Sequence, residues 1–494
     1  MTAYHREKQR HGRLPVSTKI YQGIGSLPDS AKNFAFNTFL LFYYNQVLGL
    51  PASWASLAIM VALVLDAISD PLMGSISDNL KTRLGRRHPL MYASVLPLAL
   101  GLYLVFSPPD GLGHGGLVAW LLVWAVVVRT AMTFFLVPWS ALYAEFSDDY
   151  VERSSIVTYR YLVGWLGGVV ITFGIWTFVF PSTPEFTPGH LNPEGYEMFA
   201  PIVAVVAGLS AFLTTHLTRR EIPYLLQPTA PTPPFRFRRV LDEVILALSN
   251  RDYLVIVLAA LTFSAVAGAD GALNIYMNTY FWGFNPEDLR WFALSIVGTV
   301  AAFVLVTPLQ RRFDKKTLLI GCLMISLFDG ITVVSLRFLD VLPANGDPLL
   351  LYILIANLAV LVAVLTVAGI MLASMVADLL DAQEYRTERR QEGVFSAALS
   401  FSSKATSGFG ILIGGFILDY AVGFPAGVRP DAIDPGVVTR LGIAAGIVLP
   451  LFFLIPFYLV SHYRLTREAH AEIQAALSKR RAVDGTGPTD GAAS

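Results

Sequence analysis

Twelve apolar stretches of about 20 residues follow one another along this 494-residue chain. Each is long enough to cross the hydrocarbon core of a bilayer as a helix. Hydrophobic residues make up 54% of the chain and charged residues only 15%, so a soluble protein of this length would expose too much apolar surface. The sequence therefore predicts an all-α integral membrane protein with twelve transmembrane helices. The stretches lie near residues 22–48, 53–77, 89–107, 117–146, 155–180, 197–217, 252–284, 291–310, 317–337, 348–379, 392–422 and 437–463.

A long connection divides the twelve stretches into two sets of six. It covers residues 218–251, contains five prolines and ends in the helix-like segment VLDEVILAL. We expect an N-terminal six-helix bundle at residues 1–217, a cytoplasmic linker at 218–251 and a C-terminal six-helix bundle at 252–463. Residues 464–494 are expected to form a cytoplasmic tail, first a short amphipathic helix and then a disordered end rich in Gly, Thr and Ser.

Basic residues are distributed asymmetrically among the connections. The first, third and fifth, GLPAS, SPPDGLGHGG and STPEFTPGHLNPEGYE, contain neither Lys nor Arg, whereas the even-numbered connections and the central loop contain many. Because Lys and Arg concentrate on the cytoplasmic side of a membrane protein, both termini are predicted to be cytoplasmic. Basic turns close the second stretch, at Arg86 and Arg87, and the eighth, at Arg311 and Arg312. Basic turns at equivalent places in the two halves are typical of a transporter built from two six-helix repeats.

Several features narrow the cellular context. The basic first residues lead into a span too long for a signal peptide, and no small-residue cleavage site follows, so the first helix is expected to be retained. The lone cysteine, Cys322, permits neither a disulfide framework nor a thiolate metal site. The net charge is zero, and no basic patch beyond the topology signal indicates nucleic-acid binding. Arg outnumbers Lys and no organelle signal is found, so a bacterial inner membrane is the expected location.

Two carboxylates, Asp66 and Asp70, lie inside the second apolar stretch. An Asp at the bilayer centre costs about 2.5–3.5 kcal/mol on insertion scales, so something must compensate the pair. Four residues apart, the two lie one turn from each other on the same helix face and can share one ligand. A proton or a hard cation such as Na⁺ would relieve their repulsion. Alternatively, both are structural and permanently paired with Lys404 or Arg129.

Three polar stripes follow helical spacing in the first, seventh and eleventh stretches. Together they predict a central polar cavity for a hydroxyl-rich solute; the alternative is that these side chains are interhelical hydrogen-bonding groups. The stripes contain Ser26, Ser30, Asn33, Asn37 and Tyr44, then Asp270, Asn274 and Asn278, then Ser396, Ser400, Ser403 and Ser407 beside Lys404. A sugar ring also packs well on an aromatic face, and Trp139 and Tyr276 are the preferred candidates among the aromatic residues of the stretches.

Charged residues also cluster at the cytoplasmic ends of the helices. Their pairing is expected to hold the cytoplasmic side shut when the carrier faces outward, and its loss to open that side. The alternative is that they are solvated loop charges that only set the topology. The clusters comprise Asp78, Arg86, Arg87, Glu145, Asp148, Asp149 and Arg153 in the first half and Asp378, Asp381, Glu384, Arg386, Arg389 and Arg390 in the second.

Catalytic constellations are not found. The eight histidines are scattered, and the chain contains no HExxH, GxSxG or Walker sequence. We therefore expect neither an enzyme nor an ATP-driven pump, and no cofactor other than a coupling ion. A gradient of an ion or a solute must supply the energy.

The segment DAISDPLMGSISDNLKTRLGRRHP resembles the second-helix signature of the glycoside-pentoside-hexuronide:cation symporters, the melibiose-carrier branch of the major facilitator superfamily. Four further segments support the resemblance, which covers nearly all twelve stretches: YQGIGSLPDS, FLLFYYNQVLGL, VPWSALYAEFSDDYVERSSI and VADLLDAQEYRTERRQEGVFSAALSFSSKATSGFG. It implies the major facilitator fold of two six-helix bundles.

The resemblance also implies roles for individual residues. Asp66 and Asp70 match the cation-binding carboxylates of the family, Thr133 matches a hydroxyl near the cation, and Lys404 matches a lysine beside the same carboxylates. Arg160 falls beside the arginine position of the fifth helix. In two places the sequence departs from the melibiose carrier: Ser30, preceded by Asp29, and Leu136 stand where that carrier has acidic sugar-binding residues. A galactoside pocket of that kind is therefore not implied.

The hypothesis from the sequence is a cation-coupled (Na⁺ or H⁺) symporter that imports a small glycoside, monosaccharide or uronide by alternating access. The alternatives are a carrier of lysolipids or other amphiphiles with the same fold, and a non-transporting membrane sensor. A monomer in the lipid bilayer is expected. The predicted cation-binding residues are Asp66, Asp70 and Thr133, with Lys404 for coupling; the predicted substrate-binding residues are Ser30, Asn33, Asn37, Tyr44, Trp139, Arg160, Asp270, Asn274 and Tyr276; and the predicted gating residues are Asp78, Arg86, Arg87, Glu145, Arg153, Asp381 and Arg389.

Overall fold

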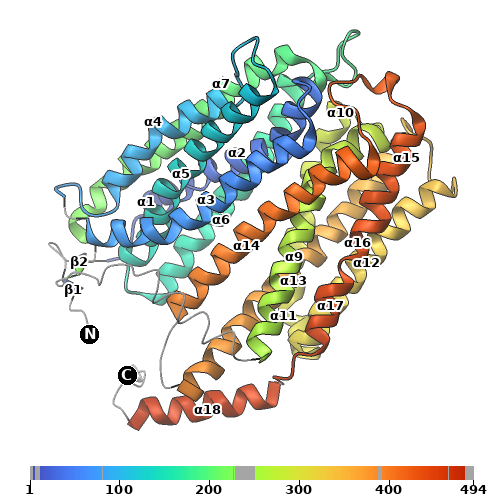
Figure 1. Ribbon diagram of the computed structural model, residues 1–494. Coiled ribbons are helices and arrows are strands. Elements are labelled where there is room, and N and C mark those ends of the chain that lie inside the picture. The colour runs from blue at the N-terminus through green and yellow to red at the C-terminus, as the bar shows by residue number, and fades with distance from the viewer. Residues whose placement is uncertain are drawn as a thin grey trace.

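The computed structural model is a bundle of long helices, and a short strand pair lies at one end of it (Figure 1). The strands β1 (Tyr4–His5) and β2 (Gln227–Pro228) pair antiparallel. Among the described residues, eleven helices are long and apolar enough to cross a membrane. The structure describes residues 4–5, 10, 12–80, 82–225, 227–228, 251–387, 392–465 and 467–483.

A twelfth spanning element is the first helix, which is interrupted and therefore falls into pieces too short to count as one span. It begins at Val16, a few residues before the apolar stretch predicted from the sequence, and it bends at Gly25 and Ser26. Two π-helical segments, Ala35–Leu40 and Tyr43–Val47, complete it. With this element the predicted fold of twelve helices is confirmed. The pieces that precede the π-helical segments are α1 (Val16–Ile24) and α2 (Leu27–Phe34).

The remaining helices match the predicted stretches in order. In the first half they are α3 (Ala52–Asn79), α4 (His88–Val105), α5 (His114–Phe146), α6 (Tyr150–Gly174) continued by Ile175–Val179, and α7 (Pro193–Thr218) continued by Arg219–Tyr224. In the second half they are α9 (Arg251–Tyr276) continued by Met277–Phe281, α10 (Pro286–Leu289), α11 (Ile296–Arg312), α12 (Lys315–Phe338), α13 (Pro348–Thr387), α14 (Glu392–Phe416) continued by Ile417–Val422, α15 (Pro435–Ile443), α16 (Leu449–Leu451), α17 (Leu454–Ser461) and the tail helix α18 (Arg467–Val483).

Parts of the predicted domain plan fall outside the described residues. The segment VLDEVILAL of the central connection and the last residues, 484–494, belong to these parts. The borders of the two predicted bundles therefore stay predictions. The amphipathic helix expected after residue 464 corresponds in position to α18.

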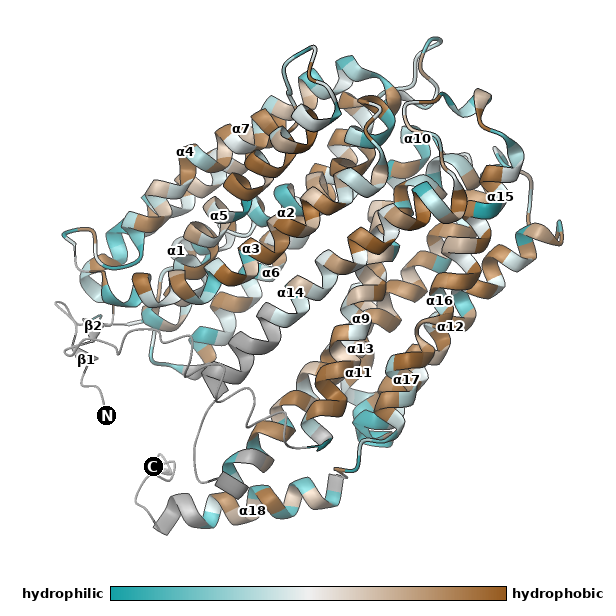
Figure 2. Ribbon diagram, in the orientation of Figure 1, coloured by the Kyte–Doolittle hydropathy of each residue, from teal (hydrophilic) through white to brown (hydrophobic). Residues whose placement is uncertain are grey.

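Hydrophobic residues predominate along the long helices (Figure 2), and many large apolar side chains are exposed on the outside of the bundle. Leu96, Val170, Phe178, Val304 and Tyr352 are each about two-thirds exposed or more. An apolar surface of this extent is unfavourable in contact with water, and in a membrane lipid tails cover it. The chain is therefore a multi-pass membrane protein.

The two ends of the bundle differ in chemistry. Strands β1 and β2 and helix α18 lie at one end, together with the Arg- and Lys-bearing turns, and we call it the basic end (Figure 1). The opposite end, here called the far end, carries α10 and the start of α15 (Figure 1). Hydrogen bonds join the two halves of the chain at the far end. The Tyr276 hydroxyl donates to Asn45 Oδ1 at 2.9 Å, and the backbone N–H of Ser53 donates to Asp419 Oδ2 at 2.7 Å.

Helix α14 of the second half also packs along α3 of the first half. Glycine makes this contact close: a Cβ atom added at Gly415 would clash with the Ser56 side chain and lie 2.7 Å from the carbonyl oxygen of Ala52. Small residues at such crossings let helix backbones approach in a membrane. The close packing places side chains of α14 directly opposite Asp66 and Asp70 of α3.

Candidate functional site

A cavity of about 520 Å³ lies between α2, α3, α5, α6 and α14. Seven charged side chains line it, which is unusual within the span of a membrane protein. They are Asp29, Lys32, Asp66, Asp70, Arg129, Arg160 and Lys404; Asn33, Asn37, Thr133, Leu136, Trp139 and Ser140 are among the other lining residues.

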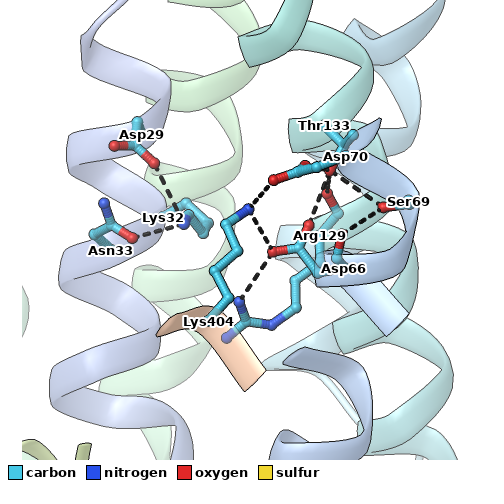
Figure 3. A network of polar contacts seen from close by, with 9 residues as sticks. All are labelled: Asp29, Lys32, Asn33, Asp66, Ser69, Asp70, Arg129, Thr133 and Lys404. Atoms are coloured by element: carbon cyan, nitrogen blue, oxygen red, sulfur yellow. Dashed lines mark hydrogen bonds and ion pairs between the residues drawn. The ribbon is translucent and has the colours of Figure 1, made fainter. Parts of the chain in front are cut away.

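The two carboxylates of α3 bind one ammonium group from the other half of the chain. Lys404 Nζ lies 3.1 Å from Asp66 Oδ2 and 2.5 Å from Asp70 Oδ2 (Figure 3). Asp66 is only 7% exposed, whereas the side chains of Asp70 and Lys404 are 26% and 37% exposed. The predicted cation-binding carboxylates and the predicted coupling lysine are thus in direct contact.

Thr133 of α5 completes this cluster. Its hydroxyl oxygen is 2.9 Å from Asp66 Oδ1 and also 2.9 Å from Asp70 Oδ1 (Figure 3). A hydroxyl carries a single hydrogen, so it can donate to only one of the two carboxylates at a time. The other carboxylate oxygen is free to bind a proton or to coordinate a cation together with the threonine oxygen. The geometry suits both coupling ions that the sequence left open.

Arg129 contributes a second positive charge. Its Nη1 atom is 3.8 Å from Asp66 Oδ2, and its guanidinium lies over the Phe36 ring. The buried Nε atom of Arg129 has no hydrogen-bond partner in the described part of the protein. Two cations therefore face two carboxylates, and the cluster is close to neutral in this conformation.

Trp139 and Arg160 form another part of the cavity wall. The guanidinium carbon of Arg160 lies 3.9 Å from the centre of the Trp139 ring and 5.3 Å from that of Tyr143. The indole N–H of Trp139 donates to the carbonyl oxygen of Gln22, which fixes the ring. Within the residues that the structure describes, Arg160 has no carboxylate partner, so its N–H groups remain available to a ligand in the cavity. Asn33 and Asn37 line the same cavity.

Tyr44 and Tyr276, two predicted substrate ligands, lie away from this cavity. Both side chains are fully buried. The Tyr44 hydroxyl donates to the carbonyl oxygen of Val105, and the Tyr276 hydroxyl to Asn45. Seven residues beyond Asn37, Tyr44 lies about 10 Å further along its helix, which carries it into the far-end contacts. In this conformation Tyr276 links the two halves at the far end, Tyr44 bonds within the first half, and neither tyrosine lines the cavity.

Ser30, Asp270 and Asn274 line neighbouring cavities. Ser30 and Asn274 belong to a cavity of about 490 Å³ between the halves, and the Ser30 hydroxyl is within 3.2 Å of the carbonyl oxygens of Ser26 and Gly164. Asp270 and Asn274 belong to a cavity of about 560 Å³ inside the second half. The residues of the predicted polar stripes therefore line several cavities rather than one.

The predicted gating charges of the first half form a network within that half. Arg86 and Arg87 both donate to Glu145 Oε1 at 2.9 Å, and Arg87 Nη1 is 2.7 Å from Asp78 Oδ1. Arg153 donates from Nε to the carbonyl oxygen of Ser147. This network joins the ends of α3, α5 and α6 at the basic end.

The second half has a corresponding network. Lys315 Nζ is 2.6 Å from Asp378 Oδ2, and the His470 ring of α18 is 3.2 Å from Asp381 Oδ2. Arg389 lies outside the described residues. These contacts join elements of one half, whereas the gating hypothesis requires contacts between halves, so that hypothesis stays a prediction.

Comparison with known proteins identifies the family. The profile of the family described as MFS/sugar transport protein matches residues 21–467. The chain belongs to this family. It is 24% identical to the putative glycoside/cation symporter YagG of Escherichia coli over 97% of this chain and 98% of that protein. It is 25% identical to the sodium-dependent lysophosphatidylcholine symporter 1 of Gallus gallus, over 96% of this chain and 92% of that protein.

The fold has solved counterparts. The nucleoside transporter NupG superposes with a TM-score of 0.57 at 12% identity, over 91% of this chain and 99% of that one. At this identity the likeness concerns the fold alone. The family match and the similarity to YagG confirm the resemblance to the glycoside-pentoside-hexuronide:cation symporters, and the chain is a transporter of the major facilitator fold and not an enzyme.

Lys32 is the site residue that sequence reasoning missed. Its Nζ atom lies 2.6 Å from Asn33 Oδ1 and 3.3 Å from Asp29 Oδ1 within the cavity (Figure 3). A lysine inside the first apolar stretch carries the same signal as the aspartates of the second, because either charge is costly in a membrane. Of the residues at the two positions where the sequence departs from the melibiose carrier, Asp29 and Leu136 line this cavity and Ser30 lines the neighbouring one.

Proposed function

We propose that this transporter couples the import of a glycoside or related sugar to Na⁺ or H⁺, with the cation bound at Asp66, Asp70 and Thr133. The observation that carries the proposal is the position of Lys404. An ammonium group from the second half sits between two carboxylates of the first half, in the place that a coupling cation would take. A cation that binds there must displace Lys404 or share the carboxylates with it.

This competition supplies a mechanism for coupling. While Lys404 bridges Asp66 and Asp70, it holds α14 against α3 and so holds the two halves in one arrangement. Na⁺ or H⁺ at the carboxylates weakens this bridge and releases Lys404 toward the cavity, where it can meet the substrate. Because coupling between two ligands is reciprocal, the substrate then tightens cation binding to the same extent. The loaded carrier changes to its other conformation by movement of one half against the other.

The substrate side of the cavity favours a solute with several hydrogen-bonding groups. Asn33 and Asn37 offer amides, Arg160 offers guanidinium N–H groups, and Trp139 offers a ring that a sugar can use once Arg160 moves. A volume of about 520 Å³ lies within the range of small-ligand sites. The description of the family and the name of YagG agree with this class of substrate.

The topology that we propose places the basic end in the cytoplasm of a bacterial cell, because Lys and Arg gather there. Both termini are then cytoplasmic, and residues 1–217 and 252–463 form the two bundles of a monomer. The far-end hydrogen bonds close the external side in this arrangement, so the conformation described above faces the cytoplasm.

A lysolipid or another amphiphile is a second candidate substrate. The observation in its favour is the similarity to a sodium-dependent lysophosphatidylcholine symporter over nearly the whole chain. The charged lining of the cavity would then receive a polar headgroup. Lysolipids therefore belong in any substrate panel.

Uptake into sealed vesicles tests the proposal. Labelled glycosides, pentoses, uronides and a lysolipid would be offered under an imposed Na⁺ gradient and then under a proton gradient. We expect accumulation of a sugar under one gradient, and its loss in both Asp66→Asn and Asp70→Asn. Accumulation that survives both substitutions would refute the assignment of the cation site to Asp66 and Asp70. Accumulation of the lysolipid alone would make a lysolipid, and not a sugar, the substrate. A carrier that binds sugar in detergent but never accumulates it would be the non-transporting sensor.

A further inference from the structure

The second half of the chain encloses a cavity of its own, formed mainly by α9, α12, α13 and the helix of α15 to α17. Its volume is about 560 Å³. Most of its wall is apolar, with Phe263, Leu361 and Phe453 as examples. Two carboxylates interrupt this wall, Asp270 of α9 and Asp329 of α12, and the function proposed above does not use Asp329.

The charge of this cavity is not balanced by the protein. None of the described residues that line it is Lys, Arg or His. The carboxylates of α3 are different, because Lys404 and Arg129 face them. A carboxylate ion in an apolar membrane cavity without a counter-charge is costly. A mobile cation must therefore reduce the charge of Asp270 and Asp329, and a proton is the smallest one.

Polar side chains around the two carboxylates have unused hydrogen-bonding capacity. Asn357 Nδ2 donates to Asp329 Oδ2 at 3.3 Å, which leaves the other carboxylate oxygen open. The Ser326 side chain lies one turn before Asp329, is 4% exposed and has no partner for its hydroxyl in the described structure. Asp270 is exposed to the cavity and makes neither a hydrogen bond nor an ion pair with any described residue. The cavity thus combines two acids with a buried hydroxyl that lacks a partner.

We propose that this cavity is a second coupling site, at which Asp329 and Asp270 take up one proton in addition to the cation bound at Asp66 and Asp70. Protonation converts a carboxylate to a neutral carboxylic acid and so removes one uncompensated charge from the apolar cavity. The site opens toward the space between the halves, because Asn274 and Asn278 line both this cavity and the one next to Ser30. The conformational change of the carrier therefore controls the access of protons to it. The coupling role rests on the proposed symport, whereas proton binding does not.

Carbodiimide labelling tests proton binding without any transport. Dicyclohexylcarbodiimide reacts with protonated carboxyl groups in apolar surroundings, and proteolysis followed by mass spectrometry locates the adduct. With the full chain in lipid nanodiscs at neutral pH, we expect adducts at Asp329 or Asp270 that decline as the pH is raised and do not respond to Na⁺. Asp110, in an exposed turn, is the internal control and should stay unlabelled. Asp329→Asn should abolish its own adduct while the protein remains folded.

Two results of the labelling test would overturn the proposal. Absence of both adducts over the whole pH range would show that neither carboxyl holds a proton, and protection by Na⁺ would make the site a sodium site instead.

Vesicle measurements then test the coupling role. Two coupled ions in a tenfold gradient support about hundredfold accumulation, and one ion supports about tenfold. Asp329→Asn, or the double variant with Asp270→Asn, should reduce substrate accumulation from about hundredfold to about tenfold. Unchanged accumulation would refute the coupling role. If no substrate accumulates even in the wild type, only the proposed symport fails, and the labelling result stands.

Discussion

Lys404 Nζ lies 2.5 Å from Asp70 Oδ2, although 334 residues separate the two along the chain. The contact joins α14 of the second half to α3 of the first, and it lies beside the cavity that contains Arg160 and Trp139. One ion pair thus connects the two halves, the predicted cation site and the predicted substrate site. A coupled carrier requires such a connection, because each ligand must change the free energy of the conformation that binds the other.

Removal of the lysine charge should separate cation binding from transport. In Lys404→Gln the carboxylates lose the ammonium that competes with the coupling ion, so we expect the apparent cation affinity to rise about tenfold. Sugar accumulation should be lost because the link between the halves is gone. Lys404→Arg keeps the charge and is the control. Cation titrations of purified protein check the prediction, and an unchanged affinity in Lys404→Gln would contradict the competition mechanism.

The hydroxyl of Thr133 should contribute measurably to cation binding. Thr133→Val keeps the shape but removes the oxygen shared by Asp66 and Asp70, and we expect cation affinity to fall about fivefold to tenfold, as for the loss of one hydrogen bond of roughly 1 kcal/mol. Thr133→Ser retains the oxygen and should behave as the wild type. Equal affinities for the Val and Ser variants would show that the hydroxyl takes no part.

Arg160 should affect the substrate more than the cation. Its guanidinium covers the Trp139 ring and has no carboxylate partner among the described residues. Arg160→Gln should weaken sugar binding by tenfold or more while cation binding in the absence of sugar stays unchanged. The measurement is isothermal titration with each ligand separately. A parallel loss of both affinities would mean that the substitution disturbs the whole cavity.

His190 should make the far-end contact sensitive to acid. Its Nε2 atom is 2.8 Å from Thr279 Oγ1 of the other half, and burial lowers the pKa of His190 to about 3. The ordinary pKa of histidine is about 6.5, so between these values the unfolded chain binds a proton that the folded protein excludes. Stability is therefore complete above pH 6.5 and declines as the pH falls toward 3, by up to about 1.4 kcal/mol per pH unit.

Thermal unfolding between pH 8 and pH 5 measures this effect. We expect the unfolding temperature of the wild type to fall over the range, and His190→Gln, which can still bond to Thr279, to fall less. The Tyr196 hydroxyl donates to the backbone oxygen of His190 and is neutral throughout, so it does not contribute to the slope. Identical slopes for both proteins would assign the acid sensitivity to other groups.

Gly415 should control how closely the halves meet. A Cβ atom there has no room against Ser56 and Ala52, so Gly415→Ala should push α14 away from α3 and populate a conformation with an open far end. Spin labels attached at Glu185→Cys and Asp431→Cys, both exposed positions, report the distance between the two halves at the far end. Both variants also carry Cys322→Ser, so that no other cysteine takes up the label. Gly321→Ala, where the added atom meets open space, is the matched control. A distance distribution unchanged from the wild type would contradict this account.

Much of the architecture follows from the sequence alone. Twelve stretches of sufficient length and apolarity predict twelve helices, because a backbone in lipid must satisfy its hydrogen bonds within each segment. The intramembrane charges Asp66, Asp70 and Lys404 also stand out in the sequence, since each is costly without a partner. These signals are local or carried by composition, and they need no knowledge of how the helices pack.

The composition of each cavity is decided only by tertiary structure. Tyr44 and Asn37 share a face of the first helix, but they lie at different heights along it. Tyr44 therefore lies at the far end, whereas Asn37 lines the cavity. Asp329 of α12 lies beside Asn357 of α13, through a helix crossing that no spacing in the sequence records. Sequence periodicity gives the direction of a side chain around its own helix. Which neighbour that side chain contacts depends on its depth in the bundle, on bends in its helix and on how the other eleven helices pack around it.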